Sequence, residues 1–233
     1  MKKILALLLS VVMAVSLAAC GQAQQKQTSS DSTSTVDQTL DGTQLASGES
    51  LKAWNTNAGW TAFYTFTRNE NLNEAWDAAA KAFGPSIGME QLDAEGLKAM
   101  NIQVCGLEDD IAHFEFTDTT ITATDSTGKT VFAHPYTYIE TIDNAIEGDP
   151  VFVYKTDDST AGKYTYLCIT LPAIESDEGG VMRYFRLRYT ADNYRDLFAE
   201  NYAGVTGIIA DGATSEEDLD YTIRLLYGAE VNR

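Results

Sequence analysis

Residues 102 to 209 contain a series of short segments in which apolar and polar residues alternate. This pattern constrains the fold more than any other feature of the chain. The segments are rich in β-branched and aromatic residues, which favour strands, and turn sequences such as Asp125-Ser126-Thr127-Gly128 separate them. The predicted strands are 102–105, 111–116, 120–124, 130–141, 151–155, 164–171, 181–189 and 205–209. Short strands at this spacing predict a mainly β fold, an antiparallel lipocalin/calycin-like β-barrel.

Helical periodicity is found on both sides of the strand series. After an aromatic segment, 54–66, that we expect to be a strand, apolar residues recur at helical spacing from Leu72 to Phe83. Asn71 is the expected N-cap of this helix, and Gly84-Pro85 is its expected end. A weaker helix is expected over 89–100, a short one over 192–200, and a last one after a capping box that begins at Thr214. We therefore expect α-helices to flank the barrel.

The first twenty residues have the pattern of a lipoprotein signal peptide. Lys2 and Lys3 precede an apolar segment, 4–15, and Leu17-Ala18-Ala19-Cys20 resembles a bacterial lipobox. An acylated Cys20 would hold the protein on the outer face of the bacterial cell membrane by its N-terminal lipid anchor alone. Residues 21–50 are mainly Gln, Ser, Thr, Gly and Asp and predict a disordered linker, which leaves 51–233 as one barrel domain.

The chain is strongly acidic. Its net charge is −18, and loss of Lys2 and Lys3 with the signal peptide makes it −20. We expect no nucleic-acid partner, because phosphate groups would be repelled. Divalent cations and basic partners suit this charge, although acidity that merely keeps an exported protein soluble explains it equally well.

Few residues are suited to metal binding or catalysis. The chain has two histidines, His113 and His134. His113 and Glu115 share one face of a predicted strand, which is either half of a metal site or a solvent-facing polar stripe. A regular hairpin would place His134 opposite about Thr120 and roughly 23 Å from His113, too far for both to bind one ion.

Cys105 and Cys168 lie on predicted strands, and in an exported protein they form either a disulfide or two buried thiols. No nucleophile elbow, phosphate-binding glycine loop or EF-hand loop is present. We therefore expect a binding protein and not an enzyme.

Several short segments resemble the ZinT (YodA-type) family of exported, lipocalin-like zinc-binding proteins. The similarity begins at Leu51-Lys52-Ala53-Trp54 and Gly59-Trp60-Thr61-Ala62-Phe63-Tyr64, and continues at Asn71-Leu72-Asn73-Glu74-Ala75-Trp76. It returns at Gly106-Leu107-Glu108-Asp109-Asp110-Ile111 and at Gly179-Gly180-Val181-Met182-Arg183-Tyr184-Phe185. The resemblance implies a calycin-type barrel, zinc as ligand and a metal transporter as a possible partner.

The resemblance also implies zinc-binding histidines that this chain does not retain. The corresponding late segment is Phe198-Ala199-Glu200-Asn201, and 202–211 contains no histidine. The remaining candidate ligands are Glu200, Asn201, Asp211 and His134. The carboxylate oxygens of Glu200 and Asp211 favour harder ions than zinc, so the chain has either lost tight zinc binding or uses another cation or ligand.

Two hypotheses follow from the sequence. The first is an extracytoplasmic lipoprotein that captures or buffers a divalent cation. The second is a lipocalin-like module without metal, which binds a protein partner or takes a small organic ligand at a barrel mouth lined by tyrosines. The candidate tyrosines are Tyr136, Tyr138, Tyr154, Tyr164, Tyr166 and Tyr184.

Overall fold

The computed structural model describes residues 39–40, 43–44, 48–146, 148–175, 182–200 and 202–231. The signal peptide, Cys20, most of the linker and Asn201 lie outside these residues. In the first unit of the chain, Met1–Ser47, strands β1 (Thr39–Leu40) and β2 (Thr43–Gln44) pair antiparallel. The second unit, Gly48–Arg233, contains the buried hydrophobic core, which begins at Leu51. A chain that starts at Gly48 therefore keeps the whole described core, and we expect it to fold on its own.

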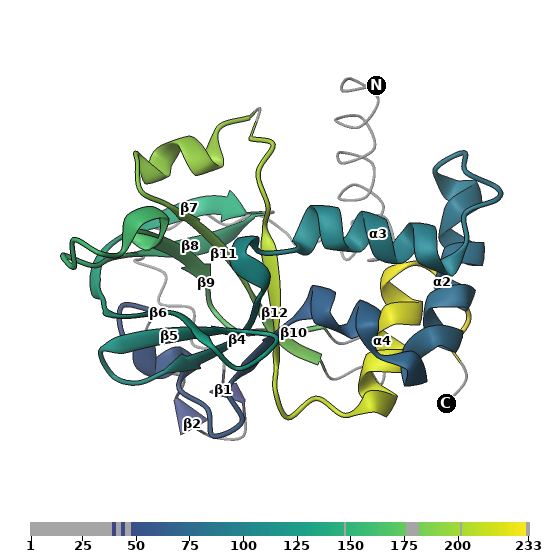
Figure 1. Cartoon of the computed structure of the whole chain (residues 1–233), viewed down its shortest axis with the longest axis horizontal. Coiled ribbons are helices and arrows are strands. Elements are labelled where there is room, and N and C mark those ends of the chain that lie inside the picture. The colour runs from purple at the N-terminus through teal and green to yellow at the C-terminus, as the bar shows by residue number, and fades with distance from the viewer. Residues whose placement is uncertain are drawn as a thin grey trace, which may run out of the picture. The chain divides into compact units, whose positions relative to one another are not determined.

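The second unit is built on a mainly antiparallel sheet that curls into a half-barrel (Figure 1). The strand order is β6-β5-β4-β3-β12-β11-β9-β8-β7, and β10 pairs with β11 outside this path. The bounds are β3 Trp60–Ala62, β4 Ile111–Phe116, β5 Thr120–Asp125, β6 Thr130–Pro135, β7 Thr137–Ile146, β8 Asp149–Lys155, β9 Tyr166–Thr170, β10 Ala173–Glu175, β11 Met182–Thr190 and β12 Gly207–Asp211. This architecture confirms the predicted lipocalin-like fold with flanking helices.

One bent strand brings the two ends of the sheet order together. Strands β6 and β7 are separated in sequence by Tyr136 alone, although one pairs with β5 and the other with β8. The sheet order from β6 to β7 contains eight antiparallel pairings. Because each pairing reverses the strand direction, β6 and β7 run in the same direction. The single strand predicted over 130–141 is thus two strands, because the chain changes partner at Tyr136.

Trp54 fills the inside of the curl. It ends the short 3₁₀-helix η1 (Leu51–Trp54) and is fully buried. Its indole nitrogen donates to the carbonyl of Thr170 at 3.0 Å, and its own carbonyl accepts from the indole nitrogen of Trp60 at 2.6 Å. Its ring lies between 6.0 and 6.5 Å from rings on three different strands, those of Phe116, Phe152, Tyr154 and Phe185. The interior of the barrel is therefore a packed aromatic core.

Three α-helices form a lobe at one end of the sheet (Figure 1): α2 (Asn73–Ser86), α3 (Ala94–Cys105) and α4 (Glu216–Leu226). The ring of Tyr227, just past α4, lies 6.1 Å from Trp76 and 5.3 Å from Phe83 of α2. Its hydroxyl accepts from the Asn101 amide of α3 at 2.9 Å. The 3₁₀-helices η2 (Phe63–Arg68) and η3 (Glu70–Leu72) connect β3 to α2.

The connection between β11 and β12 covers the outer face of the sheet. Its 3₁₀-helix η6 (Tyr194–Phe198) brings Leu197 against Ile146, Val151, Val153 and Cys168 of β7 to β9. The Arg188 guanidinium lies 4.4 Å from the centre of the Tyr202 ring and donates to Thr206 at 2.7 Å, which holds this connection in place.

Several predicted boundaries are wrong for local reasons. Residues 102–105 are the last turn of α3 and not a strand, because Asp93 caps the helix at its start and regular helix continues to Gly106. Only Trp60–Ala62 of the aromatic segment is a strand. The segment expected as a helix at 192–200 is the short η6.

Helix ends also differ from the predictions. Asn69 and not Asn71 caps η3, and α2 follows it from Asn73 without a side-chain cap. Helix α2 continues through Gly84-Pro85 to Ser86. The cap of α4 is Ser215, which accepts from the Asp218 N–H. Among the described residues, none of the helices has the length and apolarity that a membrane span needs.

Candidate functional site

His134, a sequence-predicted metal ligand, contacts the carboxylate of Asp158. Metal-binding histidines commonly contact a carboxylate in this way. His134 lies on β6 and is 8% exposed, and its Nδ1 is 2.9 Å from Oδ2 of Asp158. Hydrogen bonds from Thr160, and then from His134, lower the pKa of Asp158 to about 2, so this carboxylate is ionised and can only accept. Nδ1 therefore carries a proton, which leaves Nε2 as the ring nitrogen through which His134 could bind a metal ion.

The loop that carries Asp158 packs over β6. It connects β8 to β9 over residues 156–165 and contains η5 (Gly162–Tyr164). Tyr136 donates to the carbonyl of Tyr164 at 2.7 Å, and the Tyr164 ring lies 4.4 Å from that of Phe132. The His134 ring stacks on Phe132 at 5.9 Å. His134 is thus enclosed by aromatic rings and its carboxylate partner, and its position is fixed by packing.

A polar network continues from this loop to η4 (Glu108–Asp110). Tyr164 donates to Asp109 at 2.7 Å, and Lys163 pairs with Glu108 at 2.6 Å and with Asp109 at 2.8 Å. Burial, and then the hydrogen bond to Asp109, raises the pKa of the Tyr164 hydroxyl, so this group stays protonated and donates.

Asp110 completes the network. It accepts from Arg68 at 2.8 Å, from Tyr64 at 3.1 Å and from Ser126, and the Arg68 and Ser126 hydrogen bonds lower its pKa to about 2. Asp109 and Asp110 both have positive φ, 60° and 53°, which costs about 1 kcal/mol each in a residue other than glycine. Because Tyr, Lys and Arg donors already engage these carboxylates, the network is better suited to fix η4 than to bind an ion.

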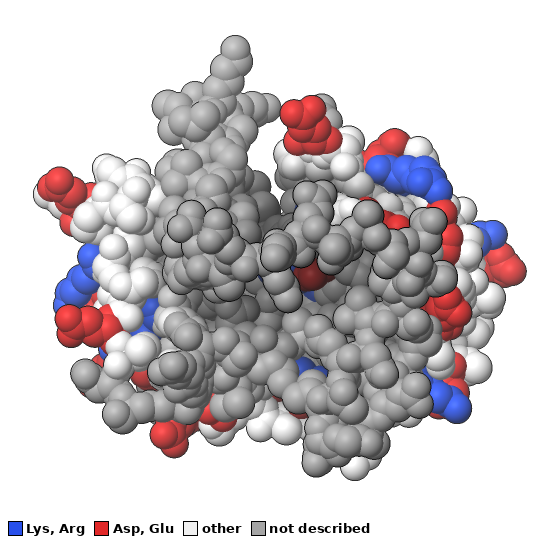
Figure 2. Space-filling view, turned by 180° about the vertical axis from the view of Figure 1, so that it is seen from behind, with Lys and Arg blue, Asp and Glu red and all other residues white. Residues whose placement is uncertain are grey.

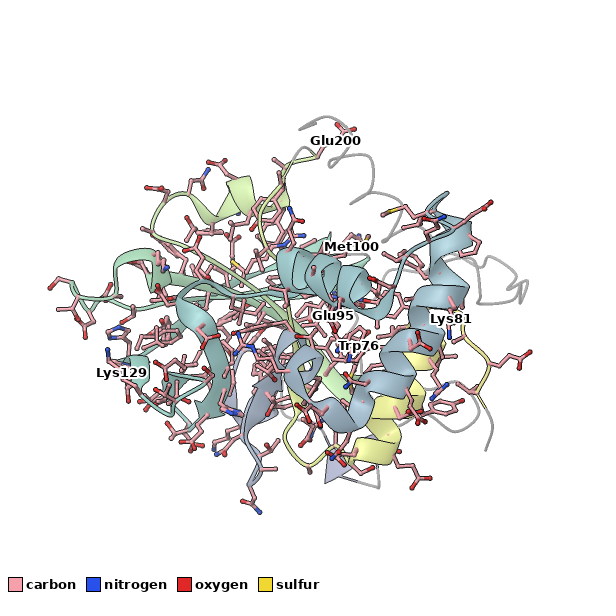
Figure 3. The ribbon with its side chains drawn as sticks, turned by 45° about the vertical axis from the view of Figure 1, so that its right-hand side comes forward. Trp76, Lys81, Glu95, Met100, Lys129 and Glu200 are labelled. Atoms are coloured by element: carbon pink, nitrogen blue, oxygen red, sulfur yellow. The ribbon has the colours of Figure 1, made fainter. Side chains whose placement is uncertain are left out.

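Asp211, another sequence-predicted ligand, lies apart from His134 in the sheet. Asp211 ends β12, is 3.7 Å from Arg183, and caps the following turn through the N–H of Ala213. In the sheet order β12 is four strands from β6, on the order of 19 Å along the sheet. Glu200 is exposed and projects from the β11–β12 connection at the top of Figure 3, and Asn201 lies outside the described residues. Among the residues that the structure describes, no three His, Cys, Asp or Glu side chains gather to hold a metal ion.

His113 and Glu115 are both exposed on β4, opposite the buried Phe114 and Phe116. This alternation is the predicted polar stripe. Nδ1 of His113 is 3.1 Å from the Thr61 hydroxyl. His134 pairs with Ile121 and not with Thr120, because a bulge after Ala123 shifts the register.

The two cysteines are buried thiols and do not form a disulfide. Cys105 ends α3 and Cys168 lies in the centre of β9. Burial raises the pKa of the Cys168 thiol to about 12, so its thiolate is scarce at neutral pH.

Three of the six tyrosines expected to line a barrel mouth are part of the core: Tyr136, Tyr154 and Tyr164 are buried. The other three, Tyr138, Tyr166 and Tyr184, are half-buried. Tyr154 donates to the carbonyl of Gly48 at 2.7 Å, which holds the segment that precedes Trp54 against β8. These three buried tyrosines therefore do not line an open mouth.

Sequence patterns did not identify Asp158 as the partner of His134, nor the network around Asp109 and Asp110. Pairs formed between distant segments leave no periodic signal in the sequence. The only available indication is the histidine itself, because a histidine at a buried strand position needs a polar partner.

Together these features define the class of fold: a lipocalin-like half-barrel with a helical lobe and a histidine–carboxylate pair at the sheet. No family model matches the sequence, and neither does any curated protein.

Two solved structures are similar to it. The Zn(II)-bound AdcA of Streptococcus pneumoniae matches with a TM-score of 0.50 and 14% identity over 78% of this chain, which spans 35% of AdcA. The Zn(II)-bound ZinT-like domain of the same AdcA matches with a TM-score of 0.49 and 15% identity, over 76% of this chain and 89% of the domain. This chain therefore shares the fold of the matched part of AdcA.

Proposed function

We propose that the protein is an exported lipoprotein whose ZinT-like barrel binds a divalent metal ion, zinc in the first instance, for capture or buffering at the outer surface of the membrane. Binding, and not catalysis, is its role. The metal is cargo, and a metal transporter is the partner class that would receive it.

The observation that carries the proposal is the fold shared with AdcA, whose structure is Zn(II)-bound. The His134–Asp158 pair supports it, because a histidine that donates through one ring nitrogen to a carboxylate presents the other nitrogen as a ligand.

The described residues do not make a closed zinc site of the usual three or four ligands. We therefore expect binding with few protein ligands, in which water fills the remaining positions. Binding of this kind is weaker than in histidine-rich sites and suits a buffer more than a tight carrier.

Calorimetric titration of the metal-free chain from Gly48 to Arg233 tests the proposal, with zinc, then manganese, then calcium. We expect one site with a dissociation constant below about 10 μM, roughly −7 kcal/mol, for one of these ions. His134→Gln should weaken binding about tenfold or more, and Asp158→Asn should weaken it less, because Asp158 orients the ring. His113→Gln is the matched control, since it removes the other histidine and should leave binding unchanged.

Flat traces for all three ions, or equal losses in the His113 and His134 variants, would exclude this metal site. In that case the second candidate is a ZinT-like module that binds a protein partner without metal. The aromatic rings packed around Trp54 inside the described barrel favour a protein over a small organic ligand.

The export part of the proposal rests on Cys20. Labelling cells with a radioactive fatty acid should mark the wild-type protein and not the Cys20→Ser variant. Label that persists in the variant would exclude the lipobox.

A further inference from the structure

The connection between α2 and α3 forms an open hollow of about 550 Å³ that takes no part in the proposed function. It lies in the helical lobe, far along the chain from β6 and His134 (Figure 1). Residues 88–93 and Gly96 line it. Met89 is 40% exposed there, one of three large hydrophobic residues that are exposed in the described part of the chain.

Met89 is exposed because of how α2 ends. The Gly88 N–H donates to the Pro85 carbonyl, and the Met89 N–H donates to the Gly84 carbonyl at 2.8 Å. With φ of +74° at Gly88, this is a Schellman motif, in which the residue after the glycine usually packs on a side chain one turn back. That position is Gly84, which has no side chain. Met89 is therefore left without its usual apolar contact.

The hollow is preformed. A Cβ at Gly84 would lie 2.5 Å from the Met89 carbonyl oxygen, so only glycine lets the loop approach α2 this closely. The Leu92 N–H donates to the Met89 carbonyl at 2.8 Å, and the Leu92 side chain covers Gly96. Ala99 and Met100 follow Gly96 at helical spacing on α3, and both keep some exposure. The apolar strip thus continues from the loop along the helix.

The rim of the hollow is acidic. Glu90 is exposed and forms no ion pair within the described ranges, and Asp93 is the α3 cap. Glu95 pairs with the buried Lys98 at 2.9 Å, but its side chain remains 81% exposed. Figure 3 shows Glu95 and Met100 on α3. The net charge of the whole chain is −18. Where Figure 2 shows described residues, acidic and basic groups alternate along the edge of the molecule. A local excess of carboxylates around methionine therefore favours a positively charged partner.

We propose that this hollow is a docking surface for a cationic amphipathic helix of a partner protein. One apolar side chain of the helix packs against Met89 and Leu92, and its Lys or Arg residues lie against Glu90 and Glu95. Methionine suits this role because its unbranched side chain adapts to the shape of the partner, and an amphipathic helix presents apolar and basic residues together.

Fluorescence anisotropy with a labelled helical peptide of Leu and Lys tests the proposal on the chain from Gly48 to Arg233. The control peptide has Glu in place of every Lys. We expect the cationic peptide to bind at least about tenfold more tightly than the anionic one. Met89→Ala and Glu90→Lys should each weaken the cationic peptide about fivefold or more.

Two matched variants separate docking from general charge attraction. Ile139→Ala removes an apolar residue of equal exposure, 41%, on β7, and Glu115→Lys reverses an exposed carboxylate on β4. Both should change affinity less than about twofold. Equal losses in these controls, or equal binding of both peptides, would overturn the proposal.

The hollow could instead be occupied by a second copy of this chain. Sedimentation over a range of concentrations tests this alternative. A dimer that Met89→Ala converts to monomer would make the hollow a self-interface and would overturn the proposal. A monomer at all concentrations, with the peptide results above, supports it. Metal binding through His134 is measured separately, so failure of one proposal leaves the other testable.

Discussion

Replacement of Trp54 tests whether the barrel interior is a packed core. The side chain is fully buried, contacts rings on three strands and donates to Thr170. An indole of this kind buries about 150–250 Å², which at about 25 cal/mol per Å² corresponds to roughly 4–6 kcal/mol. Truncations of large aromatic residues in other cores cost about 3–5 kcal/mol. We therefore expect Trp54→Ala to lower the free energy of unfolding by about 4 kcal/mol.

Urea unfolding followed by circular dichroism measures this loss, with Ile139→Ala as an exposed control that should cost less than about 1 kcal/mol. Trp54→Phe keeps a ring but removes the hydrogen bond to Thr170, and should cost about 2 kcal/mol. For a domain of this size, Trp54→Ala should lower the melting temperature by roughly 12 °C. A loss below about 1.5 kcal/mol would show that the interior is not packed, and would revive a ligand cavity.

Three further predictions concern pH, thiol reactivity and the α2–α3 loop. The Arg68 and Ser126 hydrogen bonds lower the pKa of Asp110 below its value in the unfolded chain. The stability that this group contributes is therefore present above about pH 4 and is lost as the pH falls toward 2. The urea midpoint of Asp110→Asn should fall less steeply over this pH range than that of the wild type. Cys168, with its pKa raised to about 12 by burial, should react with a thiol reagent at pH 8 only after unfolding, and fast reaction of the native chain would contradict its burial. Gly84→Ala should lower the free energy of unfolding by about 2 kcal/mol, because its Cβ would clash with the Met89 carbonyl of the loop. Gly88→Ala should cost only about 1 kcal/mol, because its Cβ would meet open space. The reverse order of stability in thermal melts would contradict this.

The sequence predicted the parts of the fold that depend on local pattern. Alternation identified β4 to its exact residues, 111–116, because one face of that strand is buried and the other exposed. The same rule failed at 102–105, where residues that favour strands close a helix. A helix already capped at Asp93 and packed through Leu97 and Asn101 decides the conformation of its last turn, whatever the local propensity.

The candidate site was less predictable, because its contacts join distant segments. His134 and Asp158 meet only because the chain bends at Tyr136 and the β8–β9 loop packs back over β6. Neither the bend nor the loop position has a periodic signature. The family resemblance predicted the fold, but one of its candidate ligands, Asp211, lies on β12, four strands from the β6 strand of His134.

The filled interior moves the question of function to the surface. In a lipocalin-like barrel a ligand usually enters the curl, but here Trp54 occupies that space, and Tyr154 and Gly48 hold its segment in place. A cation that binds at His134 would do so beside Asp158, whose Oδ2 is 2.9 Å from Nδ1. Asp158→Gly removes this hydrogen-bond partner of the ring and should weaken metal binding, although less than His134→Gln does. If metal binds to Asp158→Gly as tightly as to the wild type, Asp158 does not orient a metal-binding ring, and only the His134 variant then decides whether His134 is a ligand.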